Sequence, residues 1–401
     1  MKLKLLNAGQ NYRIIGGSDR YQFQLAELLT RHGHKVIPFA GKHPDNLPSE
    51  WESYFPPAPD FEHPGLWDLT NYVYSRPAKR AMSRLLEKIS IDIAHLHIYY
   101  GKLTSSILQP LREKGIPIVQ TTHEFKLSCP VYTLSCHGEL CEKCAGGHYY
   151  HAVLQRCNRG SFLRSGLSAL ESYVSVKNGA IDGVDHFIAV SEFMREKLVS
   201  HGLSPNRITA IHNYIDVSGI EVAENEGAYL LYFGRFEANK GIMTLLKAAA
   251  MHRDIDLVLV GAGGLEPVMR DYVAQEKLDN VTIRGFMDQA SLYEVIKGSV
   301  CSIIPSEWYE TFGLTSIESF AKGKPVIASR IGGIPEVVED RVDGFLFEPG
   351  NAQELGEYMK WMWENRGAAV TMGKKGRQNV ERKFNPEDHY RKLMDVYRKL
   401  L

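Results

Sequence analysis

Short apolar runs alternate with helix-like amphipathic stretches along the first half of the chain. The runs predict strands at residues 3–8, 35–40, 92–98, 116–122 and 185–191, and a helix is expected over about 19–32. This alternation is typical of βαβ units, in which parallel strands form a sheet covered by helices on both faces. The first half therefore predicts a doubly wound α/β domain.

The same pattern starts again after Asp216. Further strands are expected at residues 228–234, 256–260, 281–286, 299–305, 324–329 and 344–349, with a helix over 240–251. Polar and small residues replace the pattern over 211–228, which indicates a boundary. The last stretch begins with Asn385-Pro386, a cap followed by proline, and its apolar positions recur at helical spacing. We predict a helix there that is long enough to pack on another domain.

Residues 43–75 show the weakest pattern and are rich in proline and aromatic residues. We interpret them as a long loop that follows the second strand. Loops at the carboxyl edge of such sheets often carry specificity, so this loop is expected beside the ligand site.

Length and composition limit the possible function classes. A chain of 401 residues exceeds one ordinary core, so two domains of about 200 residues are expected. Lys+Arg and Asp+Glu both number 47, which gives no basic surplus for nucleic acid. The basic stretch 76–88 could contact a membrane, although a solvated helix face explains it better. Neither a signal peptide nor an apolar run long enough to span a bilayer is seen, so we expect a cytoplasmic protein, with peripheral contact to the inner membrane face left open.

The strongest chemical signal lies in residues 306–340. Glu310 and Glu318 are eight positions apart, and Gly313 between them marks the start of a helix. The backbone N–H groups of residues 312–315 would then form an anion site at the helix N-terminus, between two carboxylates. Such a site suits a nucleotide sugar, in which hydroxyl groups flank a diphosphate. Arg235 and Lys240 directly follow a strand, where they could neutralise that diphosphate.

These motifs resemble those of retaining glycosyltransferases of family 4, which have the GT-B fold. The resemblance rests on Glu310-x7-Glu318, on the Gly234-Arg235…Lys240-Gly241 loop, and on two later stretches, Gly323–Ser329 and Gly332–Glu336. The first half matches more loosely, and coverage is nearly the whole chain. The resemblance implies two Rossmann-like domains on either side of a cleft, with residues 1–214 as the acceptor-side domain, 215–383 as the nucleotide-sugar domain, and 384–401 as a helix that crosses back to the first domain.

The resemblance also implies a role for each matching residue. Glu310 would hold hydroxyls of the transferred sugar, Glu318 would bind the ribose, and Arg235 and Lys240 would bind the diphosphate and stabilise the leaving group. Backbone N–H groups of Phe312, Gly313 and Leu314 would face the phosphates. His123 would contact the donor sugar near the reacting carbon. The remaining predicted contacts are the diphosphate loop of Gly16 and Gly17, and the residues lining the base, namely Arg284, Phe286 and Met287.

Several of these residues also have plain structural explanations. A lone histidine at a strand end, such as His123, is often only packed, and His97 is balanced between the two interpretations. Glu336 follows Pro335 at a helix start, where capping would explain it. The family often has aspartate after the histidine, whereas this chain has Glu124, which puts the role of that position in doubt.

The expected mechanism follows from where charge develops. Departure of the leaving group builds negative charge on the diphosphate, which fixed cations and helix-terminal N–H groups stabilise. The resemblance implies a displacement on one face of the sugar, in which the leaving phosphate helps to take the acceptor proton. It requires no catalytic metal, and Asp254-Ile255-Asp256 is interpreted as the start of a strand.

Five of the six cysteines lie within residues 129–157. Cys141-x2-Cys144 is the half-site typical of tetrahedral thiolate metals, and Cys129 and Cys157 could complete it. Part of the family carries a similar insertion, with no counterpart of Cys136. We predict a structural zinc site formed by Cys129, Cys141, Cys144 and Cys157; an iron–sulfur cluster, unligated thiols, or replacement ligands among His137, His148 and His151 remain alternatives. Cys301 is expected to be core packing.

The sequence therefore predicts a retaining glycosyltransferase with a UDP- or GDP-sugar donor and a glycan, lipid-linked or small-molecule acceptor. Two alternatives stay open, a sugar-nucleotide epimerase or phosphorylase of the same fold, and a metal-organised binding module with a degenerate transferase fold. An acceptor-side insertion disfavours an epimerase, and the intact set of Arg235, Lys240, Glu310 and Glu318 disfavours a binding module. The sugar, base, acceptor, linkage and oligomeric state are not determined.

Overall fold

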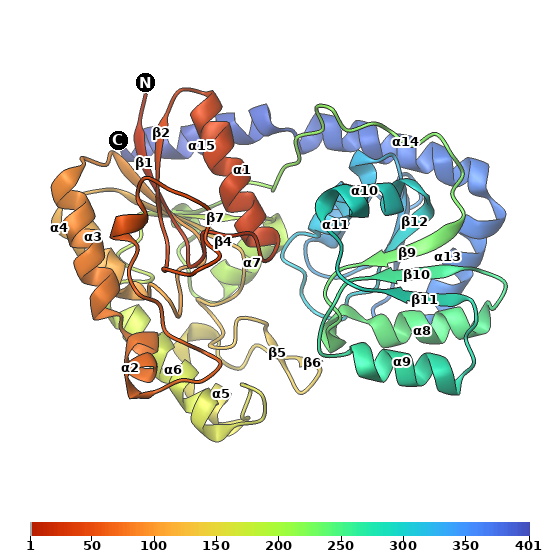
Figure 1. The fold of residues 1–401 in the computed structure, drawn as a ribbon, viewed down its shortest axis with the longest axis horizontal. Helices are drawn as coiled ribbons and strands as arrows, with labels where there is room; N and C mark the ends of the chain where they lie inside the picture. The colour runs from red at the N-terminus through yellow and green to blue at the C-terminus, as the bar shows by residue number, and fades with distance from the viewer. Residues whose placement is uncertain (1) are drawn as a thin grey trace. The chain divides into compact units, whose positions relative to one another are not determined.

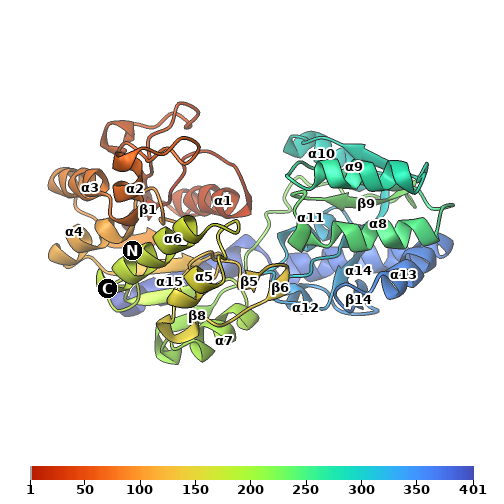
Figure 2. The ribbon, with the colours of Figure 1, turned by 90° about the horizontal axis from the view of Figure 1, so that it is seen from below.

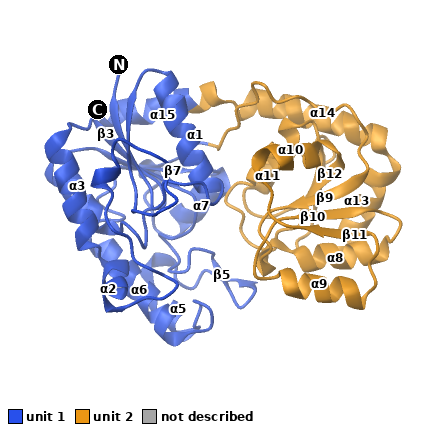
Figure 3. Cartoon of the chain, viewed as in Figure 1, with its two compact units in different colours: residues 1–211, 390–401 blue, residues 212–389 orange. Residues whose placement is uncertain are grey.

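The computed structural model describes residues 2–401, which form two compact units (Figure 3). Unit 1 comprises the residues up to Ile211 together with Tyr390–Leu401, and unit 2 comprises His212–His389. Each unit contains a six-stranded parallel sheet with helices on both faces (Figure 1). Within residues 2–401, no helix combines the length and the apolar composition that crossing a bilayer requires.

The sheet of unit 1 has the strand order β2-β1-β3-β4-β7-β8, and every adjacent pair is parallel. The chain builds outward from β1 to β2 and then returns to place β3 on the other side of β1. The strands of this unit are β1 (Lys4–Ala8), β2 (Lys35–Phe39), β3 (Ile93–Leu96), β4 (Ile118–Thr122), β7 (His186–Ala189) and β8 (Ile208–Ala210), and a small hairpin adds β5 (Ser135–Cys136) and β6 (Glu139–Leu140). Its helices are α1 (Gly17–Arg31), α2 (Leu66–Val73), α3 (Arg76–Lys88), α4 (Leu108–Glu113), α5 (Tyr150–Leu154), α6 (Phe162–Lys177) and α7 (Glu192–Ser200).

Unit 2 repeats this arrangement with the order β11-β10-β9-β12-β13-β14. Alternate residues of β9 enter different cores, because Leu230 and Tyr232 pack on one face of the sheet and Leu231 and Phe233 on the other. Its strands are β9 (Tyr229–Phe233), β10 (Leu257–Val260), β11 (Val281–Arg284), β12 (Ser299–Ile304), β13 (Val326–Ser329) and β14 (Gly344–Phe347). Its helices are α8 (Ile242–Met251), α9 (Glu266–Gln275), α10 (Gln289–Lys297), α11 (Leu314–Ala321), α12 (Ile334–Val337), α13 (Ala352–Glu364) and α14 (Arg366–Lys383).

The last helix, α15 (Pro386–Leu400), belongs to unit 1 from Tyr390 onward. The Tyr390 hydroxyl lies 2.9 Å from His34 Nε2, and the Tyr397 hydroxyl lies 2.5 Å from His95 Nδ1. Leu393 and Tyr397 are completely buried. The C-terminal residues therefore complete the core of the unit that contains the first strand.

Two expectations for the first half can be compared with the structure directly. The segment 43–75 is not a continuous loop, because it contains a short 3₁₀ turn and α2. The Asp68 carboxylate accepts the backbone N–H of Gly65 and so fixes the start of α2, a local signal that the weak apolar pattern concealed. The basic stretch forms α3, whose apolar face is buried while Arg76, Arg80, Arg84 and Lys88 are exposed, as the solvated-face interpretation predicts.

Candidate functional site

The chain order of unit 2 marks one point of its sheet as a place for a ligand. From β9 the chain proceeds outward to β10 and β11, and it then returns to β12 on the other side of β9. The loops that follow β9 and β12 therefore diverge at the carboxyl ends of two adjacent strands, which is where open α/β sheets bind ligands. Lys240 lies in the first of these loops, and Glu310 lies in the second.

The two side chains form a partly enclosed ion pair. Lys240 Nζ lies 2.6 Å from Glu310 Oε1, and their exposed fractions are 17% and 14%. Lys240 also lies over the Trp308 ring, 4.8 Å from its centroid. A lysine ammonium has three N–H groups, so this pairing leaves donors for a further anion.

Glu310 is held as a carboxylate by three donors. Ser306 Oγ at 2.6 Å and Trp308 Nε1 at 3.0 Å join Lys240 on the same oxygen, Oε1. Burial raises the pKa of Glu310, but the charge of Lys240 and the three hydrogen bonds outweigh burial, so the pKa lies below its usual value. Among the described residues no donor contacts Oε2, which leaves this oxygen able to accept from a ligand hydroxyl.

Two glycines allow these loops to approach so closely. A Cβ on Gly241 would lie 1.7 Å from the carbonyl oxygen of Pro305, and a Cβ on Gly332 would lie 2.2 Å from that of Glu310. Both glycines have positive φ, +66° and +63°. Gly333 N–H also donates to the Glu310 carbonyl at 2.8 Å. The Gly332-Gly333 pair therefore positions the backbone of Glu310. Glu336, in the short helix α12 that follows, pairs with His212, with 2.7 Å between Oε2 and Nε2.

The start of α11 provides the predicted anion site. Gly313 precedes the helix with φ of +99°, and no side chain caps the first turn. The N–H groups of this turn therefore remain available to an anion. Phe312 is buried at 1% exposure, and Glu318 lies partly exposed within the helix.

The other predicted residues of unit 2 lie in the loop after β9 and at the end of β11. Arg235 is 62% exposed and pairs with Glu237 at 2.9 Å, so its guanidinium does not share the Lys240–Glu310 contact. Arg284 ends β11, at the edge of the sheet, and is followed by Phe286, which is 81% exposed. Met287 packs partly into the core formed by β9, β10 and α10.

Unit 1 places its predicted residues at the corresponding point of its own sheet. The loop after β1 ends at Gly16 and Gly17 begins α1, and Asp19 Oδ2 accepts the backbone N–H groups of Ile15 and Gly16, each at 3.1 Å. Gly16 has φ of −150°, and no atom lies within 4 Å of the position that a Cβ would occupy. The backbone conformation and the neighbouring atoms therefore do not require glycine at position 16.

His123 follows β4 as the last member of a row of histidines. His97 stacks between His95 and His123, with ring centroids 4.6 Å and 5.5 Å away, and His97 Nδ1 lies 3.2 Å from His123 Nε2. Burial lowers the pKa of His123 to about 3, so its ring is neutral at physiological pH.

The tautomers of this pair follow from the other nitrogen of His97. His97 Nε2 is buried without a hydrogen-bond partner among the described residues. An unpaired lone pair is less costly than an unpaired buried N–H, so Nδ1 of His97 carries the proton and donates to His123 Nε2. His123 must then carry its own proton on Nδ1, which becomes a hydrogen-bond donor.

All six cysteines are free thiols. Cys157 Sγ donates to Cys136 Sγ at 3.4 Å, so the closest contact involves Cys136, which the predicted tetrad omits. Among residues 2–401, no three His, Cys, Asp or Glu side chains are arranged so that they could hold a metal ion. The structure therefore does not support the predicted zinc site of Cys129, Cys141, Cys144 and Cys157.

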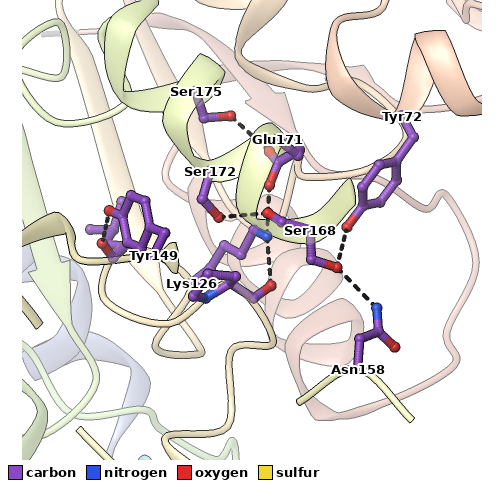
Figure 4. Close-up of polar contacts among 10 residues, drawn as sticks. Tyr72, Lys126, Tyr149, Asn158, Ser168, Glu171, Ser172 and Ser175 are labelled. Carbon is purple, nitrogen blue, oxygen red and sulfur yellow. Dashed lines mark hydrogen bonds and ion pairs between the residues drawn. The ribbon is translucent and has the colours of Figure 1, made fainter. Parts of the chain in front are cut away.

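An ion pair anchors the cysteine-containing segment instead. Lys126 Nζ lies 2.6 Å from Glu171 Oε2 of α6, and the two side chains are 6% and 0% exposed. Lys126 also donates to the Pro130 carbonyl, and Ser175 donates to Glu171 (Figure 4). Asn158 at the far end of the segment donates to Ser168 Oγ at 2.9 Å, also on α6. Helix α6 thus binds both ends of the segment.

Sequence reasoning missed Ser306 and Trp308 as partners of Glu310, although both lie within the motif that drew attention to it. It also missed Lys126 and Glu171, whose separation of 45 positions gives no local signal.

Comparison with known proteins adds two family matches that together span most of the chain. The family described as Glycosyltransferase Family 4 matches residues 15–218, and the one described as Glycosyl transferases group 1 matches residues 218–379.

Two curated relatives match part of the chain. An uncharacterized glycosyltransferase, MJ1178 of Methanocaldococcus jannaschii, is 30% identical over 220 residues, which cover 54% of this chain and 60% of that protein. The O-antigen chain mannosyltransferase C of Escherichia coli is 31% identical over 178 residues, which cover 43% of this chain and 47% of that protein. The matched part of the chain thus spans less than two thirds of either relative.

Solved structures agree with the whole fold. Sucrose-phosphate synthase from Thermosynechococcus elongatus superposes with a TM-score of 0.72 and 21% identity, covering 100% of this chain and 99% of that one. Anabaena Alr3699/HepE in complex with UDP-glucose gives a TM-score of 0.69 and 17% identity, covering 99% and 100%. The predicted fold class of two Rossmann-like α/β domains, the GT-B type, is confirmed.

Proposed function

Because the chain belongs to Glycosyltransferase Family 4, we propose that it is a retaining glycosyltransferase that transfers a sugar from a nucleoside-diphosphate sugar to a glycan, lipid-linked or small-molecule acceptor. Its own sequence motifs and its family support the transferase class. The donor base is assigned as uracil first, because Alr3699/HepE of the same fold is described with UDP and UDP-glucose. The match to an O-antigen mannosyltransferase supports a glycan or its lipid-linked precursor as acceptor.

The observation that carries the proposal is the Lys240–Glu310 pair beside the start of α11 in unit 2. A fixed ammonium and uncapped helix N–H groups at one point of a sheet suit a diphosphate. A carboxylate with one free oxygen suits sugar hydroxyls. A diphosphate joined to a sugar satisfies both halves of this set.

Each residue then has a proposed role. Lys240 and the N–H groups of Gly313 and Leu314 stabilise the negative charge that develops on the diphosphate. Arg235 turns from Glu237 to the same phosphates. Glu310 Oε2 accepts a hydroxyl of the transferred sugar, Glu318 binds the ribose, and the edge residues Arg284, Phe286 and Met287 line the base. In unit 1, Gly16 and Gly17 approach the phosphates and His123 Nδ1–H donates to the sugar.

The proposed reaction keeps the configuration of the sugar. The bond between the anomeric carbon and the leaving phosphate oxygen breaks, and the bond to the acceptor oxygen forms on the same face. The acceptor proton passes to the leaving phosphate. The cysteines have no part in this reaction, and elemental analysis of the purified protein tests whether they bind a metal.

The test is slow hydrolysis of a panel of UDP- and GDP-sugars without acceptor. We expect turnover of at least one donor, and a fall of about 10²-fold or more in Lys240→Met and in Glu310→Gln, because each removes a fixed charge from the site. Lys247→Met, an exposed lysine on the adjacent α8, is the matched control and should retain the wild-type rate. Absence of hydrolysis and of nucleotide binding by calorimetry across the panel would refute the proposal. The anomeric configuration of the released product, read by NMR, tests retention separately.

A further inference from the structure

The hairpin formed by α5 and α6 exposes an unusual number of large apolar side chains. It spans residues 150–177 and contains six of the chain's exposed large hydrophobic residues: Tyr150 (48%), Leu154 (69%), Phe162 (62%), Leu163 (80%), Leu170 (51%) and Tyr173 (41%). Only eighteen such residues are found in the described chain, so one third of them lie in 28 residues. Scattered apolar residues need no explanation, but a local concentration marks an interaction surface.

The packing of the hairpin brings the most exposed residues to one end. Helices α5 and α6 lie antiparallel, because the N–H of Tyr150 donates to the hydroxyl of Tyr173 while the N–H of Asn158 donates to Ser165 Oγ. Leu154 at the end of α5 and Phe162 and Leu163 at the start of α6 therefore lie beside the turn 155–161 (Figure 2). Ala152 and Ala169 are buried between the helices, so the exposed residues are not required for the hairpin's own packing.

The exposed charges of the turn and of the start of α6 are all positive, whereas the neighbouring β5–β6 hairpin, whose His137 lies 2.8 Å from the Gln155 carbonyl, carries the exposed Glu139. Arg156 and Arg159 in the turn and Arg164 in the first turn of α6 are exposed. The single carboxylate of the α5–α6 hairpin, Glu171, is completely buried against Lys126. Helix α2, which packs against α6, contributes one carboxylate, Asp68, and that group accepts the backbone N–H groups of Asp60 and Gly65.

We propose that the turn between α5 and α6 docks on an anionic lipid surface. Leu154, Phe162 and Leu163 enter the boundary between headgroups and acyl chains, while Arg156, Arg159 and Arg164 bind lipid phosphates. An apolar tip with flanking arginines is the pattern of an interfacial anchor, because the guanidinium groups can stay at headgroup level above inserted apolar groups.

Charge favours lipid over a second copy of the chain. A symmetric dimer through this tip would place the same three arginines of one subunit against those of the other, with no exposed carboxylate of the hairpin to compensate them. An anionic bilayer supplies that compensation. The proposal rests on the exposed surface and not on the transferase activity, so each can fail while the other holds.

Flotation of the full chain with vesicles tests the docking. We expect binding to phosphatidylglycerol mixed with phosphatidylcholine and little binding to phosphatidylcholine alone, with binding weakened by salt. Phe162→Ser/Leu163→Ser should lower the partition coefficient by about tenfold or more. Arg159→Glu/Arg164→Glu should lower it by at least about 25-fold, because each of the two cations near an anionic surface contributes about fivefold.

The matched control carries the same charge change elsewhere in unit 1. Arg80→Glu/Arg84→Glu alters two exposed arginines of α3, which has no exposed large apolar side chain, and it should bind like the wild type. Circular dichroism and donor hydrolysis establish that each variant is folded. The proposal is overturned if the wild type does not bind anionic vesicles, if the hairpin variants bind as well as the wild type, or if the α3 variant loses as much. A wild-type dimer in sedimentation that Phe162→Ser/Leu163→Ser abolishes would assign the surface to a second copy instead.

Discussion

Substituting the Lys126–Glu171 pair tests how the cysteine-containing segment is held to the rest of unit 1. At 2.6 Å and an effective dielectric constant of about 20, the attraction between the two charges is about 6 kcal/mol, most of which offsets the cost of burying them. Burial lowers the pKa of Lys126, but Glu171 raises it by more, so the pKa remains above its usual value and Lys126 stays charged at neutral pH.

Removing one partner should cost far more than removing both. Lys126→Met leaves the Glu171 carboxylate with the Ser175 hydroxyl as a hydrogen-bond donor, and Glu171→Gln leaves the ammonium with the Pro130 carbonyl. Each single change should lower the free energy of opening by about 3–5 kcal/mol, because a buried charge is left uncompensated. Lys126→Met/Glu171→Leu should recover most of this loss, since an apolar pair of similar volume often replaces a buried ion pair without penalty.

Hydrogen exchange of the backbone amides of α6 measures this opening locally. A loss of about 3–5 kcal/mol corresponds to exchange that is faster by about a hundredfold to a few thousandfold, at about 1.4 kcal/mol for each factor of ten. The amides of β9 in unit 2 are an internal reference and should not change. Glu266→Gln in the partly exposed Arg270 pair of α9 is the matched control, with an expected effect of 0–1 kcal/mol. Single variants that exchange like the wild type would refute the claim that this pair anchors the segment.

Three further predictions concern the sites themselves. Gly332→Ala should reduce donor hydrolysis by at least about tenfold, because its Cβ would overlap the Glu310 backbone. Gly350→Ala, at a similar positive φ but with no neighbour within 4 Å, should lower only stability. Equal activities of these two variants would contradict the role of Gly332 in positioning Glu310. His97→Phe should lower kcat by about tenfold with little change in donor KM, and nitrogen NMR should show His123 no longer fixed with its proton on Nδ1; an unchanged tautomer would contradict the assignment. Burial raises the pKa of Asp343 to about 6, so the folded state holds its proton between about pH 4 and 6. As pH rises through that window, unit 2 should lose about 3 kcal/mol of its free energy of unfolding. Asp343→Asn should make the free energy of unfolding, measured in urea, less dependent on pH over this window, and an equal pH dependence in both proteins would refute this.

Apolar periodicity predicted all six strands of the unit 2 sheet, because parallel strands buried on two faces need nearly continuous apolar runs, and β9, β12 and β13 provide them. In unit 1 it predicted five of the six strands and missed β8, which has only three residues. It failed at α2, where Leu66 and Trp67 are exposed and the helix lacks the apolar stripe that a buried face requires. Motif spacing also predicted that Lys240 and Glu310 belong to one site, and the sheet explains why. Both follow strands, and a parallel sheet collects its strand ends at one edge, so their sequence separation of 70 positions does not hide their proximity.

The cysteines show where the same reasoning stops. Cys141-x2-Cys144 is a local spacing, and local spacing can supply only half of a tetrahedral site. The other half depends on contacts between the β5–β6 hairpin and the turn after α5, which bring Cys136 to Cys157 across 21 positions and so produce a different pair. Helix α6 holds the segment at both ends, because it buries Glu171 against Lys126 at one end and binds Asn158 at the other. The same helix begins with the exposed Phe162 and Leu163, so this anchoring also fixes the orientation of the proposed lipid-binding tip. Lys126→Met should therefore weaken vesicle binding and also make the amides of α6 exchange faster. A tip that binds lipid independently of the Lys126–Glu171 pair would instead retain full vesicle binding in this variant.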